Sequence, residues 1–85
     1  MILNIRMESH ELVETEIEFG LTFAGIAESA YSEGQLRRGD SARGVARTAY
    51  EQASRLIANF TDGAEELLQR LNELEAALRS LEVAL

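Results

Sequence analysis

Residues 9–33, SHELVETEIEFGLTFAGIAESAYSE, decide the fold because the helix that they predict is apolar around most of its circumference. Its polar positions form one narrow stripe, and its apolar positions form two adjacent stripes. One apolar stripe contains Val13, Ile17, Gly20, Ala24, Ala27 and Tyr31, and the other contains Leu12, Phe19, Phe23, Ile26 and Ala30. A helix of this kind must be covered on more than one side. The sequence therefore predicts that residues 9–33 form the central helix of a bundle.

Two more helices are predicted, over residues 40–60 and residues 63–84, so the expected fold class is all-α. The connections between the three helices are short, and short connections place neighbouring helices antiparallel. We therefore predict one domain, residues 1–85, folded as an antiparallel three-helix up-down-up bundle. Residues 1–8 are apolar in a partly alternating pattern, and we expect them to form a short extended N-terminal arm.

The connection before residue 40 contains Arg38-Gly39-Asp40, the tripeptide that integrins bind in adhesion proteins. We interpret it as a helix corner, because nothing around it indicates a secreted protein. Gly34 and Gly39 are expected to supply the positive φ angles of the connection. Asp40 is expected to cap the helix over residues 40–60, and Asp62 to cap the helix that follows.

The last helix carries leucines at spacings of four, three, four, three and four residues: Leu67, Leu71, Leu74, Leu78, Leu81 and Leu85. This seam is typical of a coiled coil, in which Arg70 would face Glu75 of a parallel partner chain. It is shorter than the three to four heptads that a coiled coil usually needs. A helix packed in a bundle uses the same positions, so we favour packing within the chain.

The composition excludes several classes of protein. The chain of 85 residues has no cysteine and a net charge of −7, and each of its eight basic residues is an arginine. The acidic total argues against a general nucleic-acid binder. No segment is long and apolar enough to span a membrane, and no secretory signal is visible. We therefore expect a cytoplasmic protein that does not bind a membrane.

Charge is distributed unevenly along the chain. Residues 37–55 carry five arginines and two acids, whereas the segments on both sides are acidic. We expect Arg43, Arg47 and Arg55 to face acids of the helix over residues 9–33 or of a second subunit. The alternative is a small nucleic-acid-associated regulator that uses the arginines of residues 37–55 to contact phosphates.

Catalytic and metal-binding patterns are weak. His10 is the single histidine, and its pairing with Glu14 falls short of the three or four ligands that a transition metal needs. We therefore interpret His10 as part of a solvated first helical turn. No serine or glutamate stands in a pattern that indicates a nucleophile or a general acid, and no phosphate-binding loop is present. We expect a protein that is not an enzyme and that uses no metal or cofactor.

The segments AESAYSEG, residues 27–34, and ARTAYEQA, residues 46–53, resemble the paired helices of tetratricopeptide repeats and of microtubule-interacting-and-transport hairpins. Small residues and an aromatic residue interlock between the helices of those families. The matching positions are Ala27, Tyr31, Ala46, Tyr50 and Ala53. The connection between the two segments is longer than in a repeat, and only one hairpin exists. The resemblance implies binding of a peptide or protein in a helical groove.

One chain of this size has too little bulk to cover all its apolar stripes. We predict a non-enzymatic interaction module that self-associates as a homodimer or binds a partner helix. The alternative to a second copy is an unidentified protein partner. A twofold pairing of two copies of the helix over residues 9–33 would complete the bundle. The predicted interface residues are Leu12, Phe19, Phe23, Ile26, Arg43, Arg47, Leu68 and Leu85.

Overall fold

The computed structural model describes residues 5–60 and 63–84, and the side chains of residues 10–60 and 63–82. These residues form three helices and no strand: α1 (Ile5–Ser32), α2 (Leu36–Ile57) and α3 (Glu65–Ala84). The all-α prediction is confirmed. The body is elongated, at 47 × 23 × 14 Å. The 28 residues of α1, at about 1.5 Å per residue, account for most of its length.

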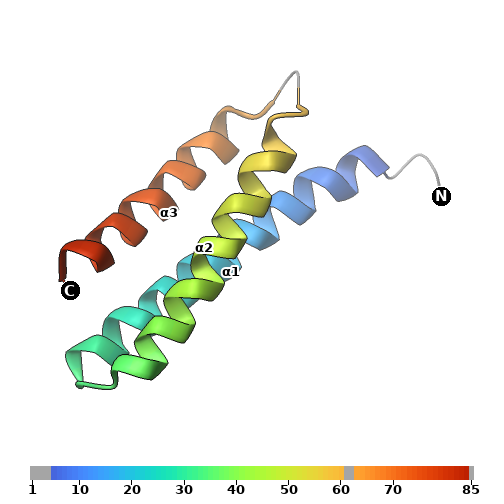
Figure 1. The fold of residues 1–85 in the computed structure, drawn as a ribbon. Helices are drawn as coiled ribbons and strands as arrows, with labels where there is room; N and C mark the ends of the chain where they lie inside the picture. Colours follow the sequence, from blue (N-terminus) through green and yellow to red (C-terminus); the bar gives the residue numbers. More distant parts are fainter. Residues whose placement is uncertain (1–4, 61–62, 85) are drawn as a thin grey trace.

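Helices α1 and α2 lie side by side and form the most extensive contact of the fold (Figure 1). Small side chains line this contact, which brings the two backbones close together. The buried alanines are Ala24, Ala27 and Ala30 of α1 and Ala42, Ala46, Ala49 and Ala53 of α2. Two larger residues of α1, Val13 and Ile17, are also fully buried, toward the end of α1 that precedes Gly20.

All three helices meet at Gly20. A Cβ atom at this position would lie 2.6 Å from Cδ2 of Leu74 in α3 and 3.2 Å from Cβ of Ala49 in α2. Real Cβ atoms essentially never lie as close as 2.6 Å to such an atom, so the Leu74 side chain would have to move. Leu74 is fully buried, so it has little space into which to move. Glycine is therefore needed at position 20 for its small volume, because its backbone is helical and its φ angle is not positive.

Helix α3 packs against the α1–α2 pair through its leucines. Leu67, Leu71, Leu74, Leu78 and Leu81 are all buried within the single chain. The interpretation of the leucine seam as a bundle helix therefore agrees with the structure. Nη1 of Arg70 lies 3.4 Å from Oε2 of Glu18 in α1. Arg70 therefore forms an ion pair within the chain and does not need Glu75 of a partner chain for one. Leu85, the last leucine of the seam, lies outside the described residues.

The corner between α1 and α2 differs from the prediction. Helix α2 begins at Leu36, and Gly39 and Asp40 are inside it. Gly34 has a positive φ of 77° as predicted, but the positive φ predicted for Gly39 is wrong. A Cβ atom at Gly39 would lie 2.5 Å from the ring of Tyr31, so this glycine leaves room for the tyrosine. Asp40 does not cap α2, and instead accepts a hydrogen bond of 2.6 Å from the Tyr31 hydroxyl.

The other predicted boundaries differ by a few residues. Helix α1 begins at Ile5, so the extended arm predicted for residues 1–8 is wrong for residues 5–8, while residues 1–4 lie outside the described residues. Helix α2 ends at Ile57 and α3 begins at Glu65. Asp62, the predicted cap of the last helix, also lies outside the described residues.

His10 does not lie in a purely solvated turn. Its ring is stacked on Phe60, with ring centroids 4.4 Å apart and an interplanar angle of 6°. Phe60 follows the end of α2, so this contact ties the first part of α1 to the chain that leaves α2. The sequence does not indicate this contact, because His10 and Phe60 are fifty residues apart and do not belong to one motif.

We expect Gly20→Val to lower the free energy of unfolding by about 1–3 kcal/mol, the usual cost of an overpacked core. The matched control is Gly44→Ala, since no atom lies within 4 Å of a Cβ atom at position 44 of α2. The control should raise the same free energy by about 0.5–1 kcal/mol, because alanine favours a helix more than glycine does. Urea unfolding followed by circular dichroism measures both. A Gly20→Val chain as stable as the wild type would contradict the three-helix contact.

Stability should also fall at high pH. The hydrogen bond to Asp40 raises the pKa of Tyr31 above its ordinary value of 10.0, and burial next to the charge of Glu75 raises the pKa of Tyr50. A pKa that is higher in the folded chain contributes stability that is complete below pH 10 and lost as the pH rises through the folded value. We therefore expect the urea midpoint to fall above pH 10, and to fall less in the double variant Tyr31→Phe/Tyr50→Phe. An equal fall in both chains would rule out the tyrosines as its source.

Candidate functional site

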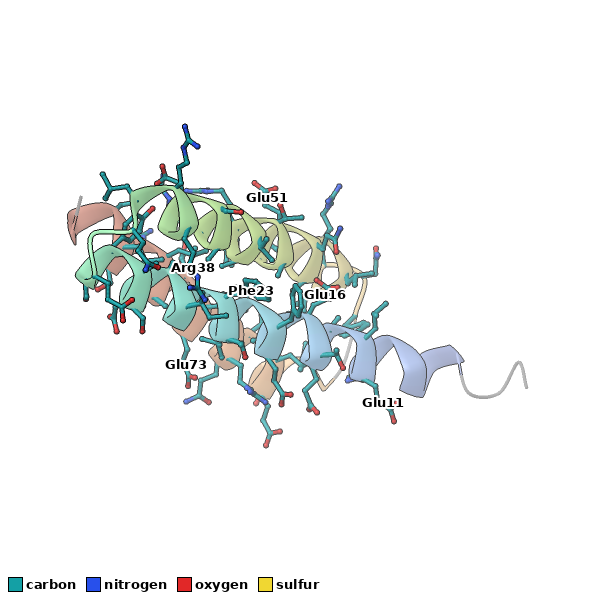
Figure 2. The ribbon with its side chains drawn as sticks, turned by 90° about the horizontal axis from the view of Figure 1, so that it is seen from below. Glu11, Glu16, Phe23, Arg38, Glu51 and Glu73 are labelled. Atoms are coloured by element: carbon teal, nitrogen blue, oxygen red, sulfur yellow. The ribbon has the colours of Figure 1, made fainter. Side chains whose placement is uncertain are left out.

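Helix α3 covers only one side of the α1–α2 pair. In Figure 2, which views the pair from below, α3 lies behind α1 and α2. On α1, Leu12, Phe19, Phe23 and Ile26 are seven, four and three residues apart, which places them on one stripe at about 100° per residue. This stripe and the adjoining stripe of α2 form what we call the open face. Its members are Leu12, Glu16, Phe19, Phe23 and Ile26 of α1 and Arg38, Ser41, Val45, Thr48 and Gln52 of α2.

The centre of the open face is aromatic and accessible. Phe19 is 49% exposed, and its ring centroid lies 4.7 Å from that of Phe23, with the two rings tilted by 46°. Leu12 is 51% exposed. Phe23 and Ile26 are half-buried and pack against the core below them. The open face therefore presents apolar side chains that are supported from beneath.

Two shallow hollows border this aromatic centre. One has a volume of about 520 Å³ and lies between Glu16 and Phe19 of α1 and Val45 of α2, with smaller side chains around them. The other has a volume of about 420 Å³ and lies beside Ile26 and Arg38. The remaining residues of this second hollow are Thr22, Gly25, Ser29, Ala30, Glu33 and Gln35. Both hollows can receive side chains from a partner.

Opposite charges lie on the two sides of the aromatic centre. Figure 2 shows Arg38, Phe23 and Glu16 in a row where α1 and α2 adjoin. Glu16 lines the larger hollow and Arg38 lines the smaller one. Among the residues that the structure describes, neither side chain takes part in an ion pair. Both charges are therefore available to a partner.

The structure separates the predicted interface residues into two groups. Leu12, Phe19, Phe23 and Ile26 lie together on the open face, but Arg43, Arg47 and Leu68 lie elsewhere. Arg47 pairs with Glu82 of α3 at 3.0 Å, so its expected partner in α1 is wrong, and a partner in a second subunit stays a prediction. Arg43 is one helical turn before Arg47, so it lies on the same flank of α2, which faces α3. Leu68 belongs to α3 and is 44% exposed. Leu85 lies outside the described residues.

Sequence reasoning missed the α2 side of the open face. The prediction that Asp40 caps the second helix places Arg38 in the connection before that helix. Once α2 is known to begin at Leu36, Arg38, Val45 and Gln52 fall on one helical stripe. Glu16 was missed because it is one of several glutamates of α1, and nothing in the sequence distinguishes it from the others.

The described residues offer little for chemistry. They contain no group of three or more histidine, aspartate or glutamate side chains that could hold a metal ion. His10 is stacked on Phe60 and does not line either hollow. The open face therefore lacks a histidine that could serve as a general base to Ser41 or Thr48. None of the helices in the described residues has the length and hydropathy needed to cross a bilayer.

We expect Phe19→Ala to lower the free energy of unfolding by about 1 kcal/mol or less, because half of this side chain is already in water. The control is Ile17→Ala, two positions earlier in α1, where the side chain is fully buried and the loss should be about 2–5 kcal/mol. Urea unfolding at a protein concentration low enough to dissociate any assembly measures both. Equal losses would show that Phe19 is a core residue.

No protein-family model matches this chain, and neither does any curated protein or solved structure with which it was compared. The geometry of the open face therefore carries the functional argument.

Proposed function

We propose that this chain is a small, non-enzymatic protein–protein interaction module that self-associates as a homodimer through its open face. The observation that carries the proposal is the pair of half-exposed side chains, Leu12 and Phe19, on a supported apolar stripe that α3 leaves uncovered. Contiguous apolar surface of this kind marks an interface more often than it marks ordinary protein surface. A cytoplasmic location is part of the same proposal.

The small apolar core of the single chain also favours association. A chain of 85 residues buries a limited core, and here much of that core is alanine, which contributes little apolar area. Each aromatic side chain transferred from water into an interface contributes in proportion to its buried area, at about 25 cal/mol per Å². Burial of the open face would therefore add apolar contacts that the single chain lacks.

The proposal includes an up-down-up order of the three helices. Two contacts between α1 and α2 support it, Tyr31 with Asp40 and Gly20 with Ala49. The stacking of His10 on Phe60, which follows the end of α2, supports it as well. As residue numbers fall along α1 in this series, they rise along α2. Two hydrogen bonds between α2 and α3 also indicate an antiparallel order. Arg47 donates to Glu82, and Tyr50, later in α2, donates to Glu75, earlier in α3.

The resemblance to tetratricopeptide-like and microtubule-interacting-and-transport hairpins stays a prediction. Ala27 and Ala46 share one buried cluster, and Tyr31 and Tyr50 pack against it, which is compatible with interlocking helices. Hairpins of those families bind peptides or proteins in helical grooves. The open face also lies where two helices adjoin and carries two hollows, so the resemblance supports the same kind of use.

Nucleic-acid binding has weaker support. The arginines of α2 do not share one flank, because Arg43 and Arg47 lie toward α3 whereas Arg38 lies on the open face. Arg47 is already paired with Glu82. A surface that neutralises phosphates needs several unpaired cations on one side, and the net charge of −7 opposes such binding.

Sedimentation across a wide concentration range tests the proposal. The wild type should exceed the 9.4 kDa of one chain, and Phe19→Gln should return it to that mass without loss of helix in circular dichroism. The matched control is Leu36→Gln, which removes an apolar side chain that is 60% exposed but lines neither hollow. A wild type that stays at 9.4 kDa throughout would refute self-association.

A further inference from the structure

We propose that two copies pair through their open faces about a twofold axis beside α1, midway between Phe19 and Phe23, and that Glu16 of each chain pairs with Arg38 of the other. The proposal rests on the self-association proposed above and specifies its geometry. It assigns roles to two residues, Glu16 and Arg38, for which the single chain provides no ion-pair partner among its described residues.

The axis is placed by the aromatic centre. Phe19 and Phe23 are the rings that lie together on this face, and residue 21 is midway between them. A twofold axis perpendicular to α1 makes the two copies of α1 run in opposite directions. A residue five positions before the axis then faces a residue five positions after it, and each is about 7.5 Å from the axis at about 1.5 Å per residue.

This register brings the charges together. Glu16 lies five positions before residue 21, so it faces Ile26 of the second copy. Arg38 lines the same hollow as Ile26, so its guanidinium is beside the incoming carboxylate. The twofold symmetry repeats the contact with the roles of the chains exchanged. One dimer contact therefore contains two ion pairs, each between Glu16 of one chain and Arg38 of the other.

The same register also accommodates Leu12. This residue lies nine positions before the axis and therefore faces Ala30 of the second copy. Ala30 lines the hollow of about 420 Å³, together with Ile26 and Ser29. The exposed leucine of each chain is thus aligned with a hollow of the other. The pairing of Glu16 with Arg38 and the alignment of Leu12 with the hollow involve different residues, but one position of the axis produces both.

A second copy suits the face better than an unrelated helix because the face is complementary to itself. It carries an acid on one side of the apolar centre and an arginine on the other, which is what an isologous contact requires. Two chains with a net charge of −7 each repel one another. Local pairs of opposite charge then select the one orientation in which the chains meet.

Charge reversal tests the pairing. Glu16→Arg and Arg38→Glu should each raise the dissociation constant of the dimer about tenfold or more, because each replaces two attractions by two repulsions. The double variant Glu16→Arg/Arg38→Glu should return to within about threefold of the wild type. The controls Glu51→Arg and Arg37→Glu change the net charge by the same amounts at exposed positions that line neither hollow, and should have little effect.

Disulfide trapping tests the register without changing Glu16 or Arg38. The chain has no cysteine, so Leu12→Cys and Ser29→Cys variants each carry a single thiol. When the two variants are mixed and oxidised, the disulfide that joins one variant to the other should form faster than a disulfide between two copies of the same variant. The two copies of position 12 would be about 27 Å apart along the helix axis, whereas a disulfide needs Cα atoms within about 7 Å.

The outcomes separate this pairing from the proposed function. A wild type that dimerises, with no rescue in the double variant and no preference for the mixed disulfide, would overturn the pairing and leave self-association intact. A wild type that is monomeric at every concentration would overturn both. Rescue by the double variant together with preferential mixed cross-linking supports the pairing.

Discussion

The contact of Gly20 with Ala49 and Leu74 is the constraint on which the rest of the structure depends. A glycine and an alanine at this point let α1 and α2 approach closely, and the side chain of Leu74 enters the space that remains. A larger residue at either small position would separate the helices and displace the leucine. The alanines along both helices and the buried leucines of α3 extend the same arrangement in both directions.

A contact made of small residues forces the large side chains of α1 to its flanks. Ile17 and Leu21 pack in the core clusters that include leucines of α3, whereas Phe19 is half-exposed on the other flank, beside the half-buried Phe23. The single chain has one further helix with which to cover two apolar flanks. The open face is therefore a direct consequence of how the apolar residues of α1 are distributed around its axis.

The periodic parts of the fold were predictable, and the contacts between distant segments were not. Helical spacing identified the three helices and the leucines of α3, because a repeated pattern over twenty residues leaves few alternatives. The start of α2 was misplaced because glycine and aspartate usually mark a helix boundary, and here Gly39 makes room for the ring of Tyr31 instead. The pairing of Arg47 with Glu82 depends on how α3 is rotated about its own axis. The apolar half of the open face was predicted, but Glu16 and Arg38 were not, since their places on either side of the aromatic centre follow only from the packing of α1 against α2.

The glycine and alanine contact between α1 and α2 also defines a signature by which related chains could be recognised. The constraint is on volume at fixed intervals, with small residues at positions 20, 24 and 27 and at positions 42, 46, 49 and 53. This contact itself constrains neither the identity nor the charge of the exposed residues between these positions. Divergent relatives would therefore share few identical residues while retaining this spacing, followed by a helix with leucines alternately four and three apart. A search based on side-chain volume and interval would find such relatives where residue identity does not.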